Sequence, residues 1–111
     1  MQPGLIIEKG RLNISDKNVL TKKPINILKL FICDLDSKIL IHPQALRLVS
    51  QNLDLVDSEL KNSFEANDLF LSLLIDYGNP ERVLRRMNEV GFLGAFIPDF
   101  GRRVALMQFN M

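Results

Sequence analysis

From Pro24 onward, apolar residues recur every three or four positions, which is the spacing of one face of an α-helix. Residues that begin or end helices stand between these stretches. The pattern predicts four helices: one at residues 24–35, one that opens at His42-Pro43 and keeps its apolar stripe through Val56, one from the capping residue Ser63 to the stop at Tyr77-Gly78, and one from Asn79-Pro80-Glu81 to Gly91. The chain is therefore predicted to be mainly α-helical.

The last of these helices has the most specific start signal. Asn79 can cap a free backbone N–H of the first turn, and Pro80 suits the first helical position because its missing N–H is not needed there. Glu81 and Arg85 stand four residues apart, which favours an ion pair along the helix. Beyond the helix, residues 92–97 are apolar throughout and predict one short helical turn pressed into a core.

A β-hairpin is predicted ahead of the helices. The runs Leu5–Glu8 and Arg11–Ile14 flank Lys9-Gly10, a two-residue connection typical of a tight hairpin turn. Two strands alone are only marginally stable, and no later segment offers a convincing third strand, although residues 39–41 are candidates for brief pairing. The predicted fold is mainly α, an N-terminal β-hairpin followed by four or five short helices, and the segment looks like an excised part of a larger protein.

The composition is that of one globular domain. Of the 111 residues, 47% are hydrophobic and 24% are charged, so the chain should bury a core. The longest run without a charge has nine residues, Val90 to Pro98, against the roughly 20 needed to cross a bilayer, so no transmembrane helix is expected. The start, Met1 to Gly4, lacks the basic and apolar regions of a secretory signal, and a cytoplasmic location is expected.

The net charge of +1 is too small to favour nucleic acid or a membrane surface as a partner. The distribution is uneven, with net charges of +3 over residues 1–38, −4 over residues 39–79 and +2 over residues 80–111. The acidic side chains of residues 39–79 are expected to lie on solvent-exposed helix faces or to pair within the chain. The alternative is that they bind a basic partner. A cluster of arginines in the last third of the chain can also be interpreted in two ways. The arginines can form a solvent-exposed helix face, or they can bind phosphates or an acidic partner. These arginines are Arg82, Arg85, Arg86, Arg102 and Arg103.

Two side chains with reactive or metal-binding chemistry occur once each. The single cysteine, Cys33, lies among Leu30, Phe31 and Ile32, an apolar setting that predicts a buried and inert thiol. The single histidine, His42, cannot by itself build a zinc cage or a two-metal hydrolase site. A surface or helix-capping role is expected for His42.

Asp34 and Asp36 form a D-x-D triplet, a spacing that on a strand directs both carboxylates to one face, where they can hold a divalent cation for phosphoryl transfer. Here the triplet ends the helix predicted at residues 24–35, and the usual upstream Gly-Ser turn is missing. We therefore expect a solvated helix end. The sequence also contains no P-loop, G-x-G-x-x-G or G-x-S-x-G motif, so no catalytic, cofactor-binding or metal site is predicted.

Several runs of the sequence resemble one protein family. They are Glu65–Phe70 (EANDLF), Leu84–Asn88 (LRRMN), Gly91–Gly94 (GFLG), Phe96–Arg102 (FIPDFGR) and Met107–Phe109 (MQF). Two upstream runs continue the likeness: Gly10–Ile14 (GRLNI) and Pro24–Phe31 (PINILKLF). Nearly the whole chain is covered, with residues 36–60 the least distinctive. By these runs the chain resembles the bacterial protein-PII uridylyltransferase/uridylyl-removing enzymes.

The resemblance implies an enzyme that transfers UMP from UTP to the PII signal protein with the help of Mg²⁺, and removes it when glutamine is plentiful. In that family the transferase residues precede a segment like this one and an HD-type metal domain follows it, so no catalytic residue is carried over. Residues 1–20 would be the hairpin edge of an upstream nucleotidyltransferase domain, and residues 21–111 a helical connector leading into the HD domain. The segment alone is expected to be inactive. The alternative is a free-standing helical adaptor that binds another protein.

The partners implied by the resemblance are the flanking nucleotidyltransferase and HD domains, with the PII protein as a further candidate. Residues 92–97 and the apolar tail would then pack against the HD domain and would be bare in the isolated chain. The tail residues are Val104, Ala105, Leu106, Met107 and Phe109. Because bare apolar surface tends to find a partner, self-association of the isolated chain is expected.

Overall fold

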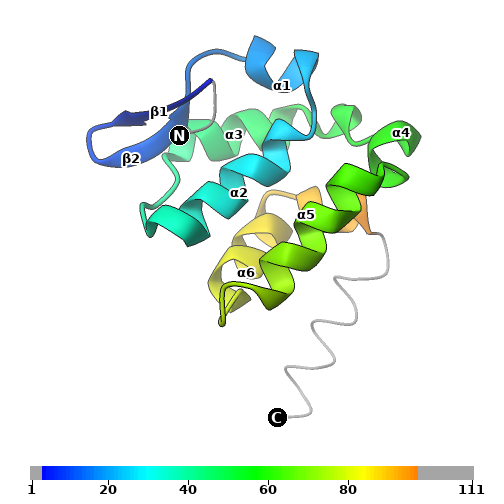
Figure 1. The fold of residues 1–111 in the computed structure, drawn as a ribbon. Coiled ribbons are helices and arrows are strands. Elements are labelled where there is room, and N and C mark those ends of the chain that lie inside the picture. The colour runs from blue at the N-terminus through cyan, green and yellow to red at the C-terminus, as the bar shows by residue number, and fades with distance from the viewer. Residues whose placement is uncertain (1–3, 98–111) are drawn as a thin grey trace.

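The computed structural model describes residues 4–97, and these form a hairpin and seven α-helices. In chain order the elements are β1 (Leu5–Glu8), β2 (Arg11–Ile14), α1 (Asn18–Lys22), α2 (Asn26–Ser37), α3 (Pro43–Gln51), the 3-10 helix η1 (Leu53–Leu55), α4 (Ser58–Lys61), α5 (Phe64–Ile75), α6 (Glu81–Glu89) and α7 (Phe92–Phe96). Figure 1 shows the hairpin beside α3 at one end of the molecule and α5 and α6 at the other. Helix α2 contacts α1, α5 and α6, so these three helices pack against it. The predicted mainly helical fold with an N-terminal hairpin is confirmed.

The hairpin has the predicted strands and turn. β1 and β2 pair antiparallel, with Leu5 opposite Ile14. Lys9 and Gly10 in the turn have φ values of 53° and 78°, the left-handed conformation that a two-residue hairpin turn requires. Glycine adopts this conformation without the steric cost that other residues meet, which is why Lys9-Gly10 was a reliable signal.

A third segment joins the hairpin at one position. The backbone N–H of Leu12 donates to the carbonyl oxygen of Leu40 at 2.8 Å, and the N–H of His42 donates to the carbonyl oxygen of Leu12 at 2.6 Å, which forms a parallel bridge between Leu12 and Ile41. Brief pairing of residues 39–41 is thus confirmed. It is an isolated bridge, and over the described residues the sheet has two strands, β1 and β2, so no third strand joins the hairpin, as expected. The buried polar backbone of Leu12 needs these partners, because an unpaired buried N–H or C=O is costly.

The helices lie close to their predicted positions, with two differences. Helix α3 ends at Gln51 and is followed by η1, whereas the apolar stripe predicted one helix through Val56. Val56 is nevertheless buried, so the stripe identified a core residue but not its backbone conformation. Helices α1 and α4 were not predicted, because five and four residues are too few to display a helical period.

The local start and stop signals act as predicted, except that Pro80 is the N-cap of α6 and not its first helical residue. Ser63 Oγ accepts a hydrogen bond from the N–H of Ala66 at 3.2 Å and caps α5. Asn79 Oδ1 accepts a hydrogen bond from the N–H of Glu81 at 3.2 Å at the start of α6. Gly91, with φ of 90°, separates α6 from α7. Each signal involves groups within a few residues of one another, so it can be read without knowledge of the tertiary structure.

Replacing Ser63 with alanine should lower the free energy of unfolding by about 1 kcal/mol, because the N–H of Ala66 loses its side-chain acceptor. The matched control is Ser50→Ala. Ser50 is exposed within α3, where alanine is the better helix former, so no loss is expected. Chemical denaturation followed by far-ultraviolet circular dichroism measures both. Equal losses for the two substitutions would contradict the capping role of Ser63.

A single apolar core contains residues of the hairpin and of the helices. Leu5, Leu12 and Ile14 from the two strands are buried in it. The hairpin is therefore packed against the helices of this chain. Each helix within residues 4–97 is too short or too polar to span a lipid bilayer.

Residues 92–97 form the predicted short helix, α7, but they are not bare. Phe92 and Leu93 have no exposed surface, and Phe96 is 4% exposed. The ring of Phe92 stacks on Phe31 of α2, and the ring of Phe96 lies 5.6 Å from Phe70 of α5. The prediction that this segment offers apolar surface to a second copy is wrong, because α2 and α5 already cover it. The apolar tail named with it lies outside the described residues.

Candidate functional site

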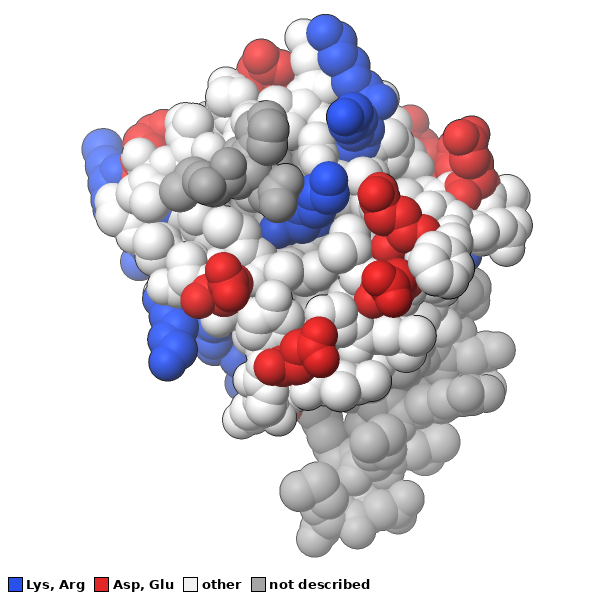
Figure 2. All heavy atoms as spheres, viewed as in Figure 1, with Lys and Arg blue, Asp and Glu red and all other residues white. Residues whose placement is uncertain are grey.

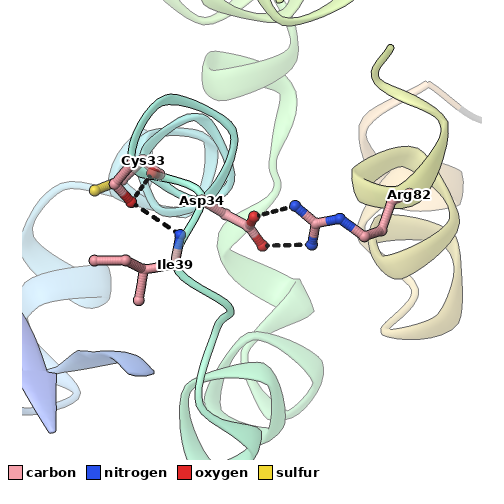
Figure 3. A network of polar contacts seen from close by, with 5 residues as sticks. Cys33, Asp34, Ile39 and Arg82 are labelled. Carbon is pink, nitrogen blue, oxygen red and sulfur yellow. Dashed lines mark hydrogen bonds and ion pairs between the residues drawn. The ribbon is translucent and has the colours of Figure 1, made fainter. Parts of the chain in front are cut away.

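Within residues 4–97, one carboxylate is buried, and it joins α2 to α6 (Figure 3). The Nη2 and Nη1 atoms of Arg82 donate to the two carboxylate oxygens of Asp34 at 2.6 and 3.2 Å. The Asp34 side chain is 4% exposed and the Arg82 side chain 45%. The prediction of a solvated helix end is therefore wrong for Asp34, and Arg82 does not belong wholly to a wet helix face.

The helical period explains why Asp34 is buried. Ile27, Phe31 and Asp34 stand at positions i, i+4 and i+7 of α2, and all three face the core. A buried carboxylate needs a partner, and Arg82 in the first turn of α6 supplies it. Hydrogen bonding to Asp34 raises the pKa of Arg82 above its ordinary value, against the opposing effect of partial burial. The pair is therefore an ion pair that links α2 to α6. The spacing of Asp34 from Ile27 and Phe31 was the sequence feature that indicated its burial.

Asp34 and Asp36 do not fit the Mg²⁺ that the resemblance implies. Both carboxylate oxygens of Asp34 already accept hydrogen bonds from Arg82, and Asp36 is exposed. Two positions along a helix correspond to a rotation of about 200°, so the two carboxylates point to different sides of α2. Across residues 4–97, no three histidine, cysteine, aspartate or glutamate side chains gather into a group suited to a metal ion.

Cys33 and His42 occupy structural positions. Cys33 packs against the core but is only half-buried, so it is less enclosed than predicted. Its carbonyl oxygen accepts a hydrogen bond from the hydroxyl of Ser37 at 2.6 Å near the end of α2 (Figure 3). His42 Nδ1 accepts a hydrogen bond from the N–H of Gln44 at 3.0 Å and caps α3. The predicted capping role of His42 is confirmed.

Arg85 and Arg86 form ion pairs along their own helix. Arg85 pairs with Glu81, as the i, i+4 spacing predicted, and Arg86 lies 3.5 Å from Glu89. All four side chains are exposed, so the interpretation of a solvated helix face is confirmed for these two arginines. Arg102 and Arg103 lie outside the described residues.

Tyr77 follows α5 and is half-buried. Burial raises the pKa of its hydroxyl group, and the nearby carboxylates of Asp36 and Asp76 raise it further. The phenol is therefore harder to deprotonate than usual. This is the opposite of what a nucleophile or general base at neutral pH requires.

A cleft of about 520 Å³ lies where the connection from α1 to α2 meets α4 and the start of α5. Its lining combines three basic with three acidic side chains: Lys22, Lys23 and Lys29, and Asp57, Glu59 and Glu65. These charges balance, so the cleft does not have the uniformly positive lining that attracts a nucleoside triphosphate. The sequence pattern did not reveal the cleft, because its lining residues come from segments about thirty residues apart.

Two relatives show high identity over the whole chain. The bifunctional uridylyltransferase/uridylyl-removing enzyme of Ruegeria pomeroyi is 48% identical over 111 residues, and the enzyme of the same name from Cereibacter sphaeroides is 47% identical over 111 residues. In each case the match covers 100% of this chain but 12% of the length of the relative. No solved structure gives a significant match to the chain.

A protein-family model defines the segment more closely. The family described as "Uridylyltransferase GlnD third domain" matches residues 5–96. That range contains both strands and every described helix from α1 to α7. Because the match takes in the hairpin, the helices and the core that joins them, the chain belongs to the family of uridylyltransferase GlnD third domains.

Proposed function

We propose that this chain is a non-catalytic helical domain of a cytoplasmic enzyme that transfers UMP from UTP to the PII signal protein and removes it again. The observation that carries the proposal is the identity of 48% and 47%, over the whole chain, to two bifunctional enzymes of which the chain spans 12%. The catalytic residues of both reactions, and the Mg²⁺ they require, would belong to the flanking nucleotidyltransferase and HD domains.

The contribution of this domain would be to hold the flanking domains in a fixed orientation. The hairpin and α7 share one core, and Asp34 and Arg82 tie α2 to α6. A unit packed in this way holds the hairpin and α7 in a fixed relative position, because close-packed interiors deform little. The assignment of residues 1–20 to the edge of the nucleotidyltransferase domain, and of residues 21–111 to the connector, is part of this proposal.

The contacts of the polar side chains support a structural role. His42 caps α3, Asp34 is occupied by Arg82, and Arg85 and Arg86 pair within α6. An arginine face whose charges are already compensated offers little to a separate acidic protein. The arginine contacts therefore do not favour a free-standing adaptor.

In the longer enzyme that contains this chain, Asp36→Asn, His42→Asn and Cys33→Ser should each change kcat for UMP transfer and for UMP removal by less than about twofold. These substitutions alter the exposed carboxylate, the imidazole and the thiol while leaving the core in place. Removing a true general acid or base costs about 10²–10⁴-fold, so the two outcomes are well separated. Transfer is measured with labelled UTP and PII, and removal by release of label from modified PII.

Circular dichroism of each variant serves as the control for folding. A loss of more than about 100-fold in either reaction by a correctly folded variant would place that residue among the groups that act in catalysis. Such a result would overturn the proposal that this domain is non-catalytic.

A further inference from the structure

Helix α5 is apolar on two opposite sides. Its inner side lies in the core and consists of Ala66, Phe70 and Leu73. Three large apolar residues on the other side are called the outer stripe: Phe64, Leu71 and Ile75, which are 85%, 54% and 71% exposed. A surface helix normally has one apolar face, so a second apolar face indicates a second neighbour. No element of residues 4–97 covers the outer stripe.

The members of the outer stripe form one row along α5. Leu71 and Ile75 stand seven and eleven residues after Phe64, which places them about 20° to either side of it around the helix axis. The row extends over about three turns, so a straight neighbour such as another helix can contact all three side chains. Apolar side chains that are exposed together in this way mark an interaction site more often than single scattered ones do.

Negative charge lies beside the outer stripe. Asp68 stands next to the row, and Glu65 and Asp76 lie farther round on the same flank. All three carboxylates are exposed, none of them forms an ion pair within residues 4–97, and residues 62–80 contain no lysine or arginine. Figure 2 shows several acidic side chains, separated by uncharged surface, on the face where α5 lies in front. This surface therefore favours a partner that carries positive charge.

A second copy of this chain and a membrane surface are poor occupants of the outer stripe. Two such stripes in contact would bring Asp68 and Asp76 of both copies into one interface, where like charges repel. A surface of anionic lipids repels the same carboxylates. The fitting occupant is an amphipathic helix that has an apolar row of its own with lysine or arginine beside it.

The size of the outer stripe favours an occupant that is covalently linked to this chain. A stable interface between separate proteins uses about 20–30 residues a side, whereas the outer stripe has three large apolar residues with carboxylates beside them. A linked segment needs fewer contacts, because a short flexible linker gives it an effective concentration of about a millimolar. The chain spans 12% of the length of the relatives it matches, so a longer enzyme of that kind has ample chain to supply such a segment.

We propose that the outer stripe of α5 is the docking face for a basic amphipathic helix in another domain of the longer enzyme. The apolar row of that helix covers Phe64, Leu71 and Ile75, and its lysine or arginine side chains pair with Asp68 and Asp76. The inference rests on the proposed function in one respect, namely that this chain is a domain of a longer enzyme. It adds a surface, separate from the ends of the chain, by which the domain holds a neighbour.

Photo-cross-linking in the longer enzyme tests the proposal. The photo-reactive residue p-benzoylphenylalanine replaces Leu71, the purified enzyme is irradiated without PII, and mass spectrometry identifies the cross-linked peptides. We expect a cross-link to a peptide outside these 111 residues, with apolar residues at helical spacing and lysine or arginine beside them. The matched control places the same photo-reactive residue at Leu40, which is also exposed but lies beside β2. It should give no cross-link to that peptide.

An exchange of charges supplies a second arm. Asp68→Lys should lower the yield of the cross-link from position 71 at least about threefold, because it places like charges in the interface. Replacing the nearest lysine or arginine of the cross-linked peptide with glutamate should have the same effect. The two changes together should restore at least about half of the lost yield, since they recreate an opposite pair. Unchanged circular dichroism of each variant serves as the control for folding.

Several results would overturn the proposal. They are a cross-link from position 71 to residues 98–111 of this chain, a cross-link to α5 of a second copy, a cross-link that forms only when PII is added, and no cross-link at all. The cross-link is read without any catalytic turnover. A catalytic residue found in this domain would therefore contradict the proposed function and leave the cross-link in place, so the failures of the two proposals are distinguishable.

Discussion

Replacing Phe92 with alanine should lower the free energy of unfolding by about 3–5 kcal/mol, the largest effect expected of any single change considered for this domain. Phe92 has no exposed surface, and its ring stacks between Phe31 at 6.1 Å and Phe96 at 5.4 Å. Alanine would leave a cavity where the contacts from α2 and α7 converge. Because a domain of this size has a net stability of about 5–15 kcal/mol, the loss would be a large fraction of the total.

A graded series separates the cavity from other effects. Phe92→Leu keeps most of the apolar volume and should cost about 1–2 kcal/mol, less than half the effect of alanine. Urea denaturation of both variants, with unchanged dependence of the unfolding free energy on urea, gives the comparison. A loss below about 1 kcal/mol for Phe92→Ala would mean that α7 is not packed into the core as described.

Replacing Arg82 with alanine should lower the free energy of unfolding by about 2–3 kcal/mol. The change leaves the carboxylate of Asp34 in the core without its two charged hydrogen bonds. Breaking a fully buried ion pair costs about 3–5 kcal/mol, but Arg82 is 45% exposed, so water can reach the site and the expected loss is smaller.

Arg85→Ala is the matched control on the same helix. Arg85 pairs with Glu81 in an exposed position, so its loss should cost no more than about 0.5 kcal/mol. The double variant Asp34→Leu and Arg82→Met removes both charges and should recover most of the stability lost in Arg82→Ala, because no unpaired charge remains buried. Denaturation curves of the four proteins test this. Equal losses for Arg82→Ala and Arg85→Ala would refute the buried tie between α2 and α6.

Features that depend on neighbouring residues were predictable from the sequence. The turn at Lys9-Gly10, the caps at Ser63 and Asn79 and the helix stop at Gly91 each satisfy a local backbone requirement. The identity of the family was also readable from short runs of sequence, and the match over residues 5–96 confirms it. Neither needs knowledge of how distant segments meet.

The helical period was informative about burial but not about partners. It placed Asp34 on the same face as Ile27 and Phe31, yet expectation assigned this carboxylate to solvent, because charged residues are seldom buried. The partner that makes burial tolerable, Arg82, lies 48 residues away. Only the packing of α6 on α2 brings the two together.

The sequence by itself thus determined the hairpin, the main helices, most of their ends and the family, because hydrogen bonding of the backbone and the apolar period act over a few residues. The tertiary structure decided which apolar surfaces are covered. It buries Phe92 and Phe96 beneath α2 and α5, and over residues 4–97 it leaves Phe64, Leu71 and Ile75 of α5 exposed. The physical reason is that an apolar residue favours burial against any apolar surface of suitable shape, and only the arrangement of the whole chain selects that surface.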